Sequence, residues 1–320
     1  MTALAIPDLA DVLAARQRIA PYLRPTPLHR YPALDALAGA QLWVKHENHQ
    51  PVGAFKVRGG INLVSQLSDD ERRRGVISAS TGNHGQSIAY AGNLLGVRAI
   101  ICVPENANPV KVESMRALGA EVTFAGRDYD DAREHCEKLA AEHGYRYIHS
   151  ANEPALVAGV GTYSLEILEQ RPDIEIIVVP VGAGSGAAGA CVVAKAVRPQ
   201  VKVIGVQAQA APSAYRSWRA RELVAAENGT FAEGMATRTS FEFTQRIMWD
   251  LLDDFVLVTE QAIRAATATM IEKTRNLVEP AGAAALAAVL ADPERFAGRR
   301  VAIICSGGNI SPAQLVALWD

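Results

Sequence analysis

Short apolar runs that are rich in β-branched residues alternate with helical patterns along most of this chain. Val201-Lys-Val-Ile-Gly-Val206 and Arg300-Val-Ala-Ile-Ile-Cys305 are nearly continuous apolar runs, as expected for strands that are covered on both faces. Alanine-rich helical patterns at about residues 261–274 and 281–290 supply such cover. Because strand patterns alternate with helical ones, the sequence predicts an α/β fold with a largely parallel sheet.

The order of these patterns divides the chain into two groups. Residues 76–150 hold successive strand and helix patterns, among them the apolar run Arg98-Ala-Ile-Ile-Cys-Val103. A second series begins with Ile174-Glu-Ile-Ile-Val-Val-Pro180. We therefore expect a small domain at 76–150 and a large domain assembled from residues 1–75 and 151–320.

The composition is that of an ordinary globular protein and excludes several classes of function. The 320 residues are 49% hydrophobic and 21% charged, with a formal net charge of −2. No basic stripe with interleaved aromatic residues is present, which argues against nucleic acid as a partner. The N-terminal residues lack a signal-peptide pattern, and no apolar run approaches the roughly 18 residues of a membrane span. We expect a cytoplasmic protein that does not enter a membrane.

The cysteines and histidines show no metal-binding pattern. Cys102, Cys136, Cys191 and Cys305 form no Cys-x-x-Cys pair, and three of them lie in apolar runs. They predict buried, inert thiols rather than disulfides or metal ligands.

Lys56 stands in an unusual environment for a charged side chain. It lies between Phe55 and Val57 in the stretch Lys45-His-Glu-Asn-His-Gln-Pro-Val-Gly-Ala-Phe-Lys-Val-Arg-Gly-Gly60. Desolvation disfavours the ammonium form, and a neutral amine is a nucleophile that can form a Schiff base with a carbonyl group. The alternative is a lysine that extends its charged end to the surface.

A glycine-rich loop follows the predicted strand that ends at Pro180. It reads Gly182-Ala-Gly-Ser-Gly-Ala-Ala-Gly189 and leads into a helix predicted from about Ala187 to Val197. Backbone N–H groups at a helix N-terminus favour a phosphate group, and glycine lets that group approach the backbone. One alternative is close packing of helix on sheet. The other is a dinucleotide site, which needs an acidic residue where this chain has Gln207.

A third segment, Ser80-Thr-Gly-Asn-His-Gly85, joins a strand pattern to the start of a helix. Its hydroxyl and N–H groups suit a carboxylate, and Asn83 can donate a hydrogen bond to a phenolate oxygen. The alternative is an ordinary helix cap.

Together with Cys305-Ser-Gly-Gly-Asn309, these segments resemble the serine/threonine dehydratase family. Its members are pyridoxal 5′-phosphate (PLP) enzymes of the tryptophan-synthase-β fold, known as fold type II. The resemblance runs from about Ala20 to about Ser311, with the motifs in the family's order. It implies two open, twisted, mostly parallel sheets flanked by helices, and a homodimer.

The resemblance also implies the roles of individual residues. It makes Lys56 both the lysine that binds PLP through a Schiff base and the general base of the reaction. The implied contacts of PLP are Phe55, Lys56, Asn83, Gly182, Ala183, Gly184, Ser185, Gly186, Glu279 and Ser306, and those of the substrate are Ser80, Thr81, Gly82 and His84. A hydroxyl such as that of Ser306 does not protonate the pyridine ring as an aspartate would, which favours loss of a β-substituent over transamination.

One segment departs from the family. Many relatives bind a divalent cation through a glutamate, a backbone carbonyl and an aspartate, where this chain has Gln207, Ala211 and Ser213. Because hard divalent cations prefer charged oxygen ligands, Mg²⁺ and Ca²⁺ are disfavoured. The neutral oxygens of these residues suit a monovalent ion such as K⁺.

The expected function is the PLP-dependent α,β-elimination of a β-hydroxy-α-amino acid, such as threonine, serine or phenylserine, to a 2-oxo acid and ammonia. An amino-acid racemase or another β-eliminating lyase of the same fold is the first alternative. Thr81 occupies the position at which the family's serine racemases have a catalytic serine, and this difference argues against racemase activity. The second alternative is a non-catalytic amino-acid-binding module, against which the set of Lys56, Asn83 and Ser306 argues.

Overall fold

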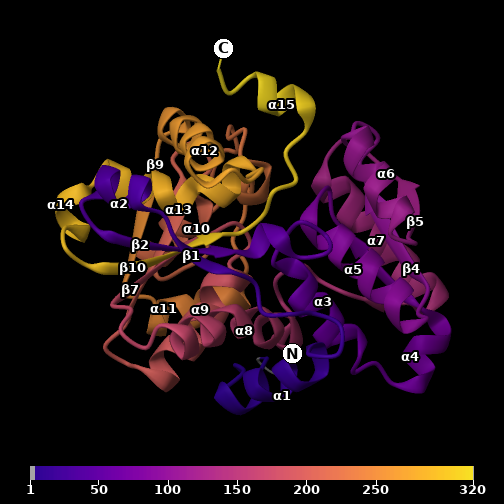
Figure 1. The fold of residues 1–320 in the computed structure, drawn as a ribbon. Coiled ribbons are helices and arrows are strands. Elements are labelled where there is room, and N and C mark those ends of the chain that lie inside the picture. The colour runs from indigo at the N-terminus through magenta and orange to yellow at the C-terminus, as the bar shows by residue number, and fades with distance from the viewer. Residues whose placement is uncertain (1–3, 320) are drawn as a thin grey trace.

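The computed structural model describes residues 4–319 and contains a larger and a smaller sheet, each flanked by helices (Figure 1). The larger sheet has the strand order β1-β2-β10-β7-β8-β9, in which β1 is antiparallel to β2 and the other pairs are parallel. Its strands are β1 (Leu28–Arg30), β2 (Gln41–His46), β7 (Ile176–Pro180), β8 (Lys202–Ala208), β9 (Asp254–Val258) and β10 (Arg300–Cys305).

The smaller sheet is entirely parallel, with the order β5-β4-β3-β6. Its strands are β3 (Val76–Ala79), β4 (Ala99–Val103), β5 (Glu121–Phe124) and β6 (Arg146–Tyr147). The prediction of an α/β fold with mostly parallel sheets is therefore confirmed.

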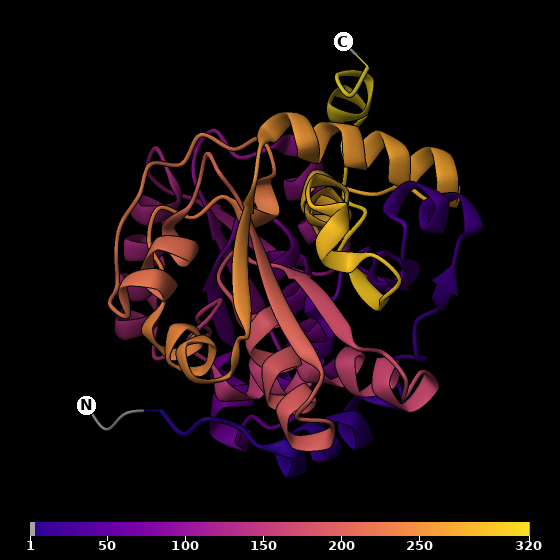
Figure 2. The same cartoon turned by 90° about the vertical axis from the view of Figure 1, so that its left-hand side faces the viewer.

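Helices cover both faces of the larger sheet because its strands are apolar on both sides. Ile177 and Val179 of β7 pack against the helices of one face, while Ile176 and Val178 pack against those of the other. The first face carries α1 (Leu9–Ile19), α8 (Pro154–Gln170), α9 (Ser185–Val197), α10 (Ser213–Ala220) and α11 (Glu242–Leu251). The second face carries α2 (Pro32–Ala38), α12 (Glu260–Thr274), α13 (Pro280–Ala291) and α14 (Pro293–Phe296). Figure 2 shows the strands of this sheet twisting between these two layers.

The smaller sheet is covered in the same way. One face packs on α3 (Lys56–Val64), α5 (Asn83–Leu95) and α6 (Pro109–Ala117), and the other on α7 (Tyr129–His143). The remaining elements are α4 (Asp69–Arg74), α15 (Pro312–Val316) and two short 3₁₀ helices, η1 (Glu47–His49) and η2 (Glu233–Met235).

The strands of the smaller sheet all lie inside the range predicted for a small domain. However, the apolar cluster beneath this sheet also includes Ile61 of α3 and Leu156 of α8. Helix α3 thus belongs to the core of the smaller sheet although it precedes residue 76. The domain boundaries at 75/76 and 150/151 stay a prediction.

Two further expectations from the sequence concern thiols and membranes. The four cysteines are buried and unpaired, as predicted. Across residues 4–319, no helix combines the length and the apolar character that crossing a membrane requires.

Candidate active site

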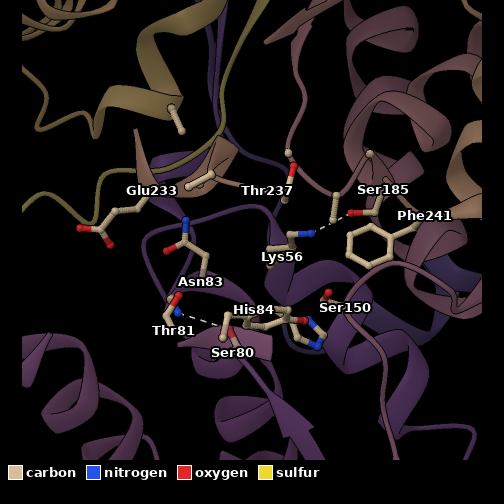
Figure 3. Close-up of a pocket in the computed structure, with 18 of the residues that line it drawn as sticks. Lys56, Ser80, Thr81, Asn83, His84, Ser150, Ser185, Glu233, Thr237 and Phe241 are labelled. Carbon is tan, nitrogen blue, oxygen red and sulfur yellow. Dashed lines mark hydrogen bonds between the residues drawn. The ribbon is translucent and has the colours of Figure 1, made fainter. Parts of the chain in front are cut away.

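A pocket of about 630 Å³ lies where the carboxyl ends of strands from both sheets meet (Figure 3). This edge is the usual position of a ligand site in an open parallel sheet. All residues predicted to contact cofactor or substrate line the pocket, namely Phe55, Lys56, Ser80, Thr81, Gly82, Asn83, His84, Gly182, Ala183, Gly184, Ser185, Gly186, Glu279 and Ser306. Segments separated by up to 251 positions in sequence, from Phe55 to Ser306, thus converge on one cavity.

Lys56 is the first residue of α3 and extends into the pocket (Figure 3). Its Nζ atom donates a hydrogen bond to Ser185 Oγ at 2.8 Å and lies 5.1 Å from the centre of the Phe55 ring. Burial lowers the pKa of Lys56 to about 8. No carboxylate in the described part of the chain forms an ion pair with it. A substantial fraction of this amine is therefore neutral slightly above neutral pH, which makes it a nucleophile and a base.

Backbone contacts fix the start of α3. The Phe55 N–H donates to the carbonyl of Ser306 at 3.1 Å, and the Ser87 hydroxyl donates to the carbonyl of Lys56 at 2.7 Å. These bonds tie Lys56 to the end of β10 on one side and to α5 on the other. The lysine is thus held between the two sheets.

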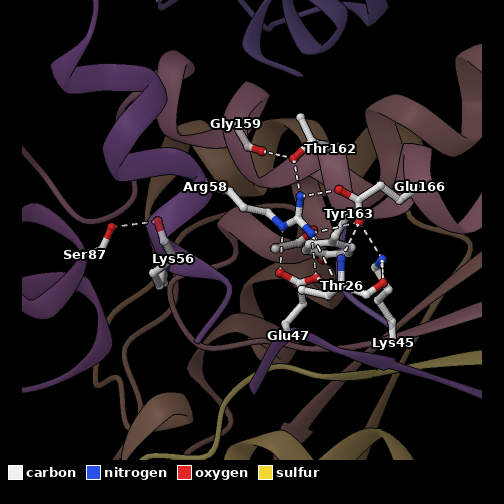
Figure 4. A network of polar contacts seen from close by, with 11 residues as sticks. Thr26, Lys45, Glu47, Lys56, Arg58, Ser87, Gly159, Thr162, Tyr163 and Glu166 are labelled. Atoms are coloured by element: carbon white, nitrogen blue, oxygen red, sulfur yellow. Dashed lines mark hydrogen bonds and ion pairs between the residues drawn. The ribbon is translucent and has the colours of Figure 1, made fainter. Parts of the chain in front are cut away.

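A buried ionic network lies behind Lys56 (Figure 4). Arg58 is 1% exposed and donates to Glu47 Oε2 at 2.7 Å and to Glu166 Oε1 at 2.6 Å. Lys45 donates to Glu166 Oε2 at 2.5 Å and to the carbonyl of Thr26 at 2.8 Å. Burial alone would raise the pKa of Glu47, but Arg58 and Lys45 lower it below its usual value. Two cations and two carboxylates therefore balance in the protein interior.

The sequence did not reveal this network. Lys45, Glu47 and Arg58 lie in the stretch around Lys56, but Glu166 comes from α8, and no local pattern links it to them. The available signal was that Glu166 lies between the apolar residues Leu165 and Ile167. A buried charge of this kind needs a partner of opposite sign.

The glycine-rich loop forms an anion-binding geometry at the N-terminus of α9. Gly184 adopts φ 91°, a left-handed conformation that favours glycine, and precedes the first helical residue, Ser185. The helix was predicted from Ala187, so Ser185 and Gly186 lie in its first turn rather than in the loop. The first N–H groups of a helix have no partner inside the helix, which leaves them available for an anion.

Side chains hold this loop in place. Thr244 Oγ1 donates to the carbonyl of Ala183 at 2.8 Å, and the Tyr163 hydroxyl donates to the carbonyl of Gly186 at 2.8 Å. Both carbonyl groups are thereby bound by side chains that do not line the pocket. The backbone N–H groups of the loop stay available to bind an anion.

The segment at the start of α5 is organised by Ser80. Its Oγ atom accepts hydrogen bonds from the N–H groups of Gly82 at 3.2 Å and Gly85 at 2.9 Å. Thr81 is exposed at the pocket surface (Figure 3).

Asn83 is fixed at both ends of its side chain. Its Nδ2 atom donates to Glu279 Oε1 at 2.7 Å, and its Oδ1 atom accepts from Asn309 Nδ2 at 2.8 Å. One hydrogen of Nδ2 remains for a ligand. Asn309 was not predicted as a site residue, although it ends the quoted Cys305–Asn309 motif.

Glu279 is 6% exposed, and burial raises its pKa above the usual value. A Cβ atom at Gly307 would lie 2.4 Å from Glu279 Oε1. Glycine is thus required beside Glu279, because any larger residue would displace the carboxylate that orients Asn83.

The opposite walls of the pocket contact one another through residues that the sequence analysis missed. Lys111 of α6 forms an ion pair with Glu233 of η2, and the rings of His149 and Phe241 meet at 4.9 Å. The residues of each pair are more than 90 positions apart in the sequence, so no local motif predicts these contacts.

The residues predicted for a monovalent ion lie outside this pocket. Gln207 Oε1 accepts from the N–H of Tyr215 at 3.0 Å, and the Ser213 hydroxyl donates to the carbonyl of Thr237 at 2.9 Å. Among the side chains that the structure describes, no group of three His, Cys, Asp or Glu is arranged to hold a metal ion. K⁺ binding at Gln207, Ala211 and Ser213 stays a prediction.

The sequence matches the family described as "Pyridoxal-phosphate dependent enzyme" over residues 19–307. It is 37% identical over 303 residues to the L-threonine ammonia-lyase of Thermotoga maritima, covering 94% of this chain and 75% of that protein. It is 36% identical over 314 residues to the L-threo-3-hydroxyaspartate ammonia-lyase of Saccharomyces cerevisiae, covering 98% of this chain and 96% of that protein. The structure matches that of maize serine racemase with a TM-score of 0.92 and 31% identity, covering 98% and 97% of the two chains.

The groups in the pocket suit this cofactor. Lys56, an amine that reacts with aldehydes in its neutral form, lies 2.8 Å from Ser185 at the anion-binding end of α9, so one small ligand can meet both. The chain belongs to the family of pyridoxal-phosphate-dependent enzymes, as a fold type II member of its serine/threonine dehydratase group.

Proposed function

We propose that this enzyme catalyses the α,β-elimination of a β-hydroxy-α-amino acid and yields a 2-oxo acid and ammonia. The observation that carries the proposal is the position of Lys56, whose Nζ atom lies 2.8 Å from Ser185 Oγ at the start of α9. Its lowered pKa of about 8 supplies a neutral amine in the pocket. Relatives named as ammonia-lyases of threonine and of 3-hydroxyaspartate support the same class of reaction.

Bound PLP supplies an aldehyde that reacts with amines and a ring that withdraws electrons from the substrate Cα. In the proposal, Lys56 would hold PLP through its Nζ atom, and the same atom in its neutral form would remove the α-proton of the substrate. Ser80 and Thr81, which precede α5, and the first turn of that helix bind the substrate carboxylate through hydroxyl and N–H groups. Ser306, at the pocket wall, presents a neutral hydroxyl rather than an acid to the ring.

The charges around the pocket favour a substrate whose β-substituent is neutral. Apart from Lys56, each lysine or arginine that lines the pocket forms an ion pair, Lys111 with Glu233, Arg133 with Glu137 and Arg238 with Asp128. A second carboxylate on the substrate has to compete with these acidic partners. We therefore propose threonine, serine or phenylserine as substrates ahead of 3-hydroxyaspartate.

Racemisation is the second candidate, because the structure matches that of a serine racemase. It requires an acid or base on the face of Cα opposite Lys56. Thr81 is the residue that the resemblance places there, and no hydrogen bond to a basic side chain activates its hydroxyl among the described residues. Elimination is accordingly favoured over racemisation.

A panel of β-hydroxy amino acids tests the proposed function. Purified holoenzyme is given L-threonine, L-serine, L-phenylserine and L-threo-3-hydroxyaspartate, and 2-oxo acid, ammonia and the D-enantiomer are measured. We expect 2-oxo acid and ammonia in equal amounts, with a higher kcat/KM for the neutral substrates. Formation of D-amino acid without ammonia would contradict elimination, and a preference for 3-hydroxyaspartate would contradict the charge argument.

Gly184 offers a test of the anion-binding loop. The Gly184→Ala variant places a side chain at φ 91° and a Cβ atom 2.8 Å from Thr244 Oγ1, which shifts the loop that we propose binds the PLP phosphate. We expect a stability loss of about 1–2 kcal/mol together with a PLP affinity lower by about tenfold or more, measured by titration of the cofactor-free protein.

The matched control is Gly39→Ala. Gly39 also has a positive φ, of 62°, but no atom lies within 4 Å of its Cβ position. This variant should lose comparable stability and keep its PLP affinity. Equal PLP affinities of the two variants would argue against the phosphate role of the loop.

Binding of K⁺, assembly as a homodimer and a cytoplasmic location stay predictions from the sequence.

A further inference from the structure

His84 has one ring nitrogen with a hydrogen-bond partner and one without. It lies in the first turn of α5, is 6% exposed and lines the pocket below Lys56 (Figure 3). Its Nε2 atom is 3.0 Å from Ser78 Oγ. Its Nδ1 atom is buried and has no hydrogen-bond partner within residues 4–319. A buried polar atom without a partner at a pocket wall points to a ligand.

The direction of the hydrogen bonds fixes which nitrogen carries the proton. The Ser78 hydroxyl donates its single hydrogen to the carbonyl of Ile148 at 2.8 Å. Ser78 Oγ can therefore only accept from His84, so the proton of the neutral ring lies on Nε2. This leaves a lone pair on Nδ1.

The imidazole stays neutral. Burial, together with the nearby charges of Lys56 and His149, lowers the pKa of His84 to about 3, although the Ile148 carbonyl acts in the opposite direction. Near neutral pH, Nδ1 therefore accepts a hydrogen bond and does not donate one.

An acceptor at this position selects among the polar groups of an amino-acid substrate. The α-carboxylate carries no hydrogen at neutral pH, and the amino nitrogen is committed to the cofactor in a PLP enzyme. The β-hydroxyl group is the remaining donor. The side chain of His84 is thus unsuited to the carboxylate contact that the resemblance implied for this residue.

We propose that His84 Nδ1 accepts a hydrogen bond from the β-hydroxyl group of the substrate and thereby selects hydroxylated amino acids. This inference rests on the proposed elimination and adds the residue that recognises the leaving group. A hydroxyl that donates to His84 keeps its oxygen lone pairs free for the proton with which it departs as water. His84 accordingly acts in recognition rather than as the acid.

Two substrates that differ only in the leaving group test the proposal. L-Serine carries a hydroxyl hydrogen, whereas L-β-chloroalanine eliminates chloride and has no hydrogen to donate. In the holoenzyme, His84→Leu should lower kcat/KM for serine about tenfold, mainly through KM, and change that for β-chloroalanine by less than about twofold. His84→Asn has nearly the same shape as the leucine variant but restores an amide oxygen, and it should recover most of the loss.

Equal losses for the two substrates in His84→Leu, or no recovery in His84→Asn, would overturn the proposal. If the wild-type enzyme eliminates neither substrate, the proposed function fails. The inference is then decided by equilibrium binding of L-serine against L-alanine, followed by the absorbance of the cofactor, in which His84→Leu should abolish a preference for serine.

The protonation state is measurable without turnover. Long-range ¹⁵N–¹H NMR correlation of ¹⁵N-histidine-labelled wild-type holoenzyme should show one neutral ring with its proton on Nε2, whose signals are missing from His84→Asn. If the ring whose signals are missing from His84→Asn carries its proton on Nδ1, or is doubly protonated at pH 7, the inference is refuted.

Discussion

Lys56→Ala is expected to abolish the formation of 2-oxo acid and ammonia. The variant loses both the amine that we propose binds PLP and the base that removes the α-proton, and the loss of the base alone costs about 10²–10⁴-fold. Borohydride reduction followed by mass spectrometry should locate PLP on Lys56 in the wild-type enzyme and find no such attachment in the variant.

The ionisation of Lys56 adds a dependence on pH. Because its pKa is lowered to about 8, the neutral fraction increases with pH through that value. The rate at which cofactor-free protein takes up PLP covalently should increase over the same range, which stopped-flow absorbance measures.

Lys138→Ala is the control for both experiments, since the side chain of Lys138 is 71% exposed and Lys138 is not among the residues that line the pocket. This variant should behave as the wild type does. Borohydride attachment of PLP to a different lysine, or Lys56→Ala activity within tenfold of the wild type, would refute the assignment.

Arg58→Met should lower the free energy of unfolding by about 3–5 kcal/mol, the usual consequence of removing one partner from a buried ion pair. Arg58 is 1% exposed and contacts both Glu47 and Glu166, which are also buried. Its removal leaves these two carboxylates with Lys45 as their single cation in the network. Chemical denaturation at saturating PLP gives the value.

Two further variants serve as comparisons for Arg58→Met. Arg58→Lys keeps the charge but not the planar fork that reaches both carboxylates, so an intermediate loss is expected. Arg73→Met removes a partner of a surface pair whose Arg73 side chain is 70% exposed, and it should change stability by less than about 0.5 kcal/mol. If Arg58→Met lost less than 1 kcal/mol, the network would not be needed to hold α3.

Much of the fold and of the candidate site followed from local patterns in the sequence. Ser80, the glycine-rich loop and Ser306 each follow a continuous apolar run. Each of these runs is a strand with a parallel neighbour, so the three segments lie at the carboxyl ends of strands. Topology brings such ends together, so the motifs sufficed to predict a shared pocket. The predicted residues all line one pocket, while their individual roles stay a prediction.

What the sequence could not give is the pairing of single side chains from distant elements. Glu166 reaches Arg58 from a helix that begins about 100 residues later, and Asn309 fixes Asn83 across 226 positions. The tautomer of His84 depends on the Ser78 hydroxyl, which donates to the carbonyl of Ile148, a residue about 70 positions away. Each of these facts is a matter of direction or distance in the folded chain, on which composition and spacing carry no information.

The charge balance beside α3 also restricts how this protein can change. Exchanging any one of Lys45, Glu47, Arg58 and Glu166 for a neutral residue leaves an unmatched charge in the interior, whereas exchanging an oppositely charged pair does not. Substitutions at these positions are therefore coupled. A mutational path that replaces them one at a time passes through poorly folded forms, and library design at this site has to vary the positions jointly.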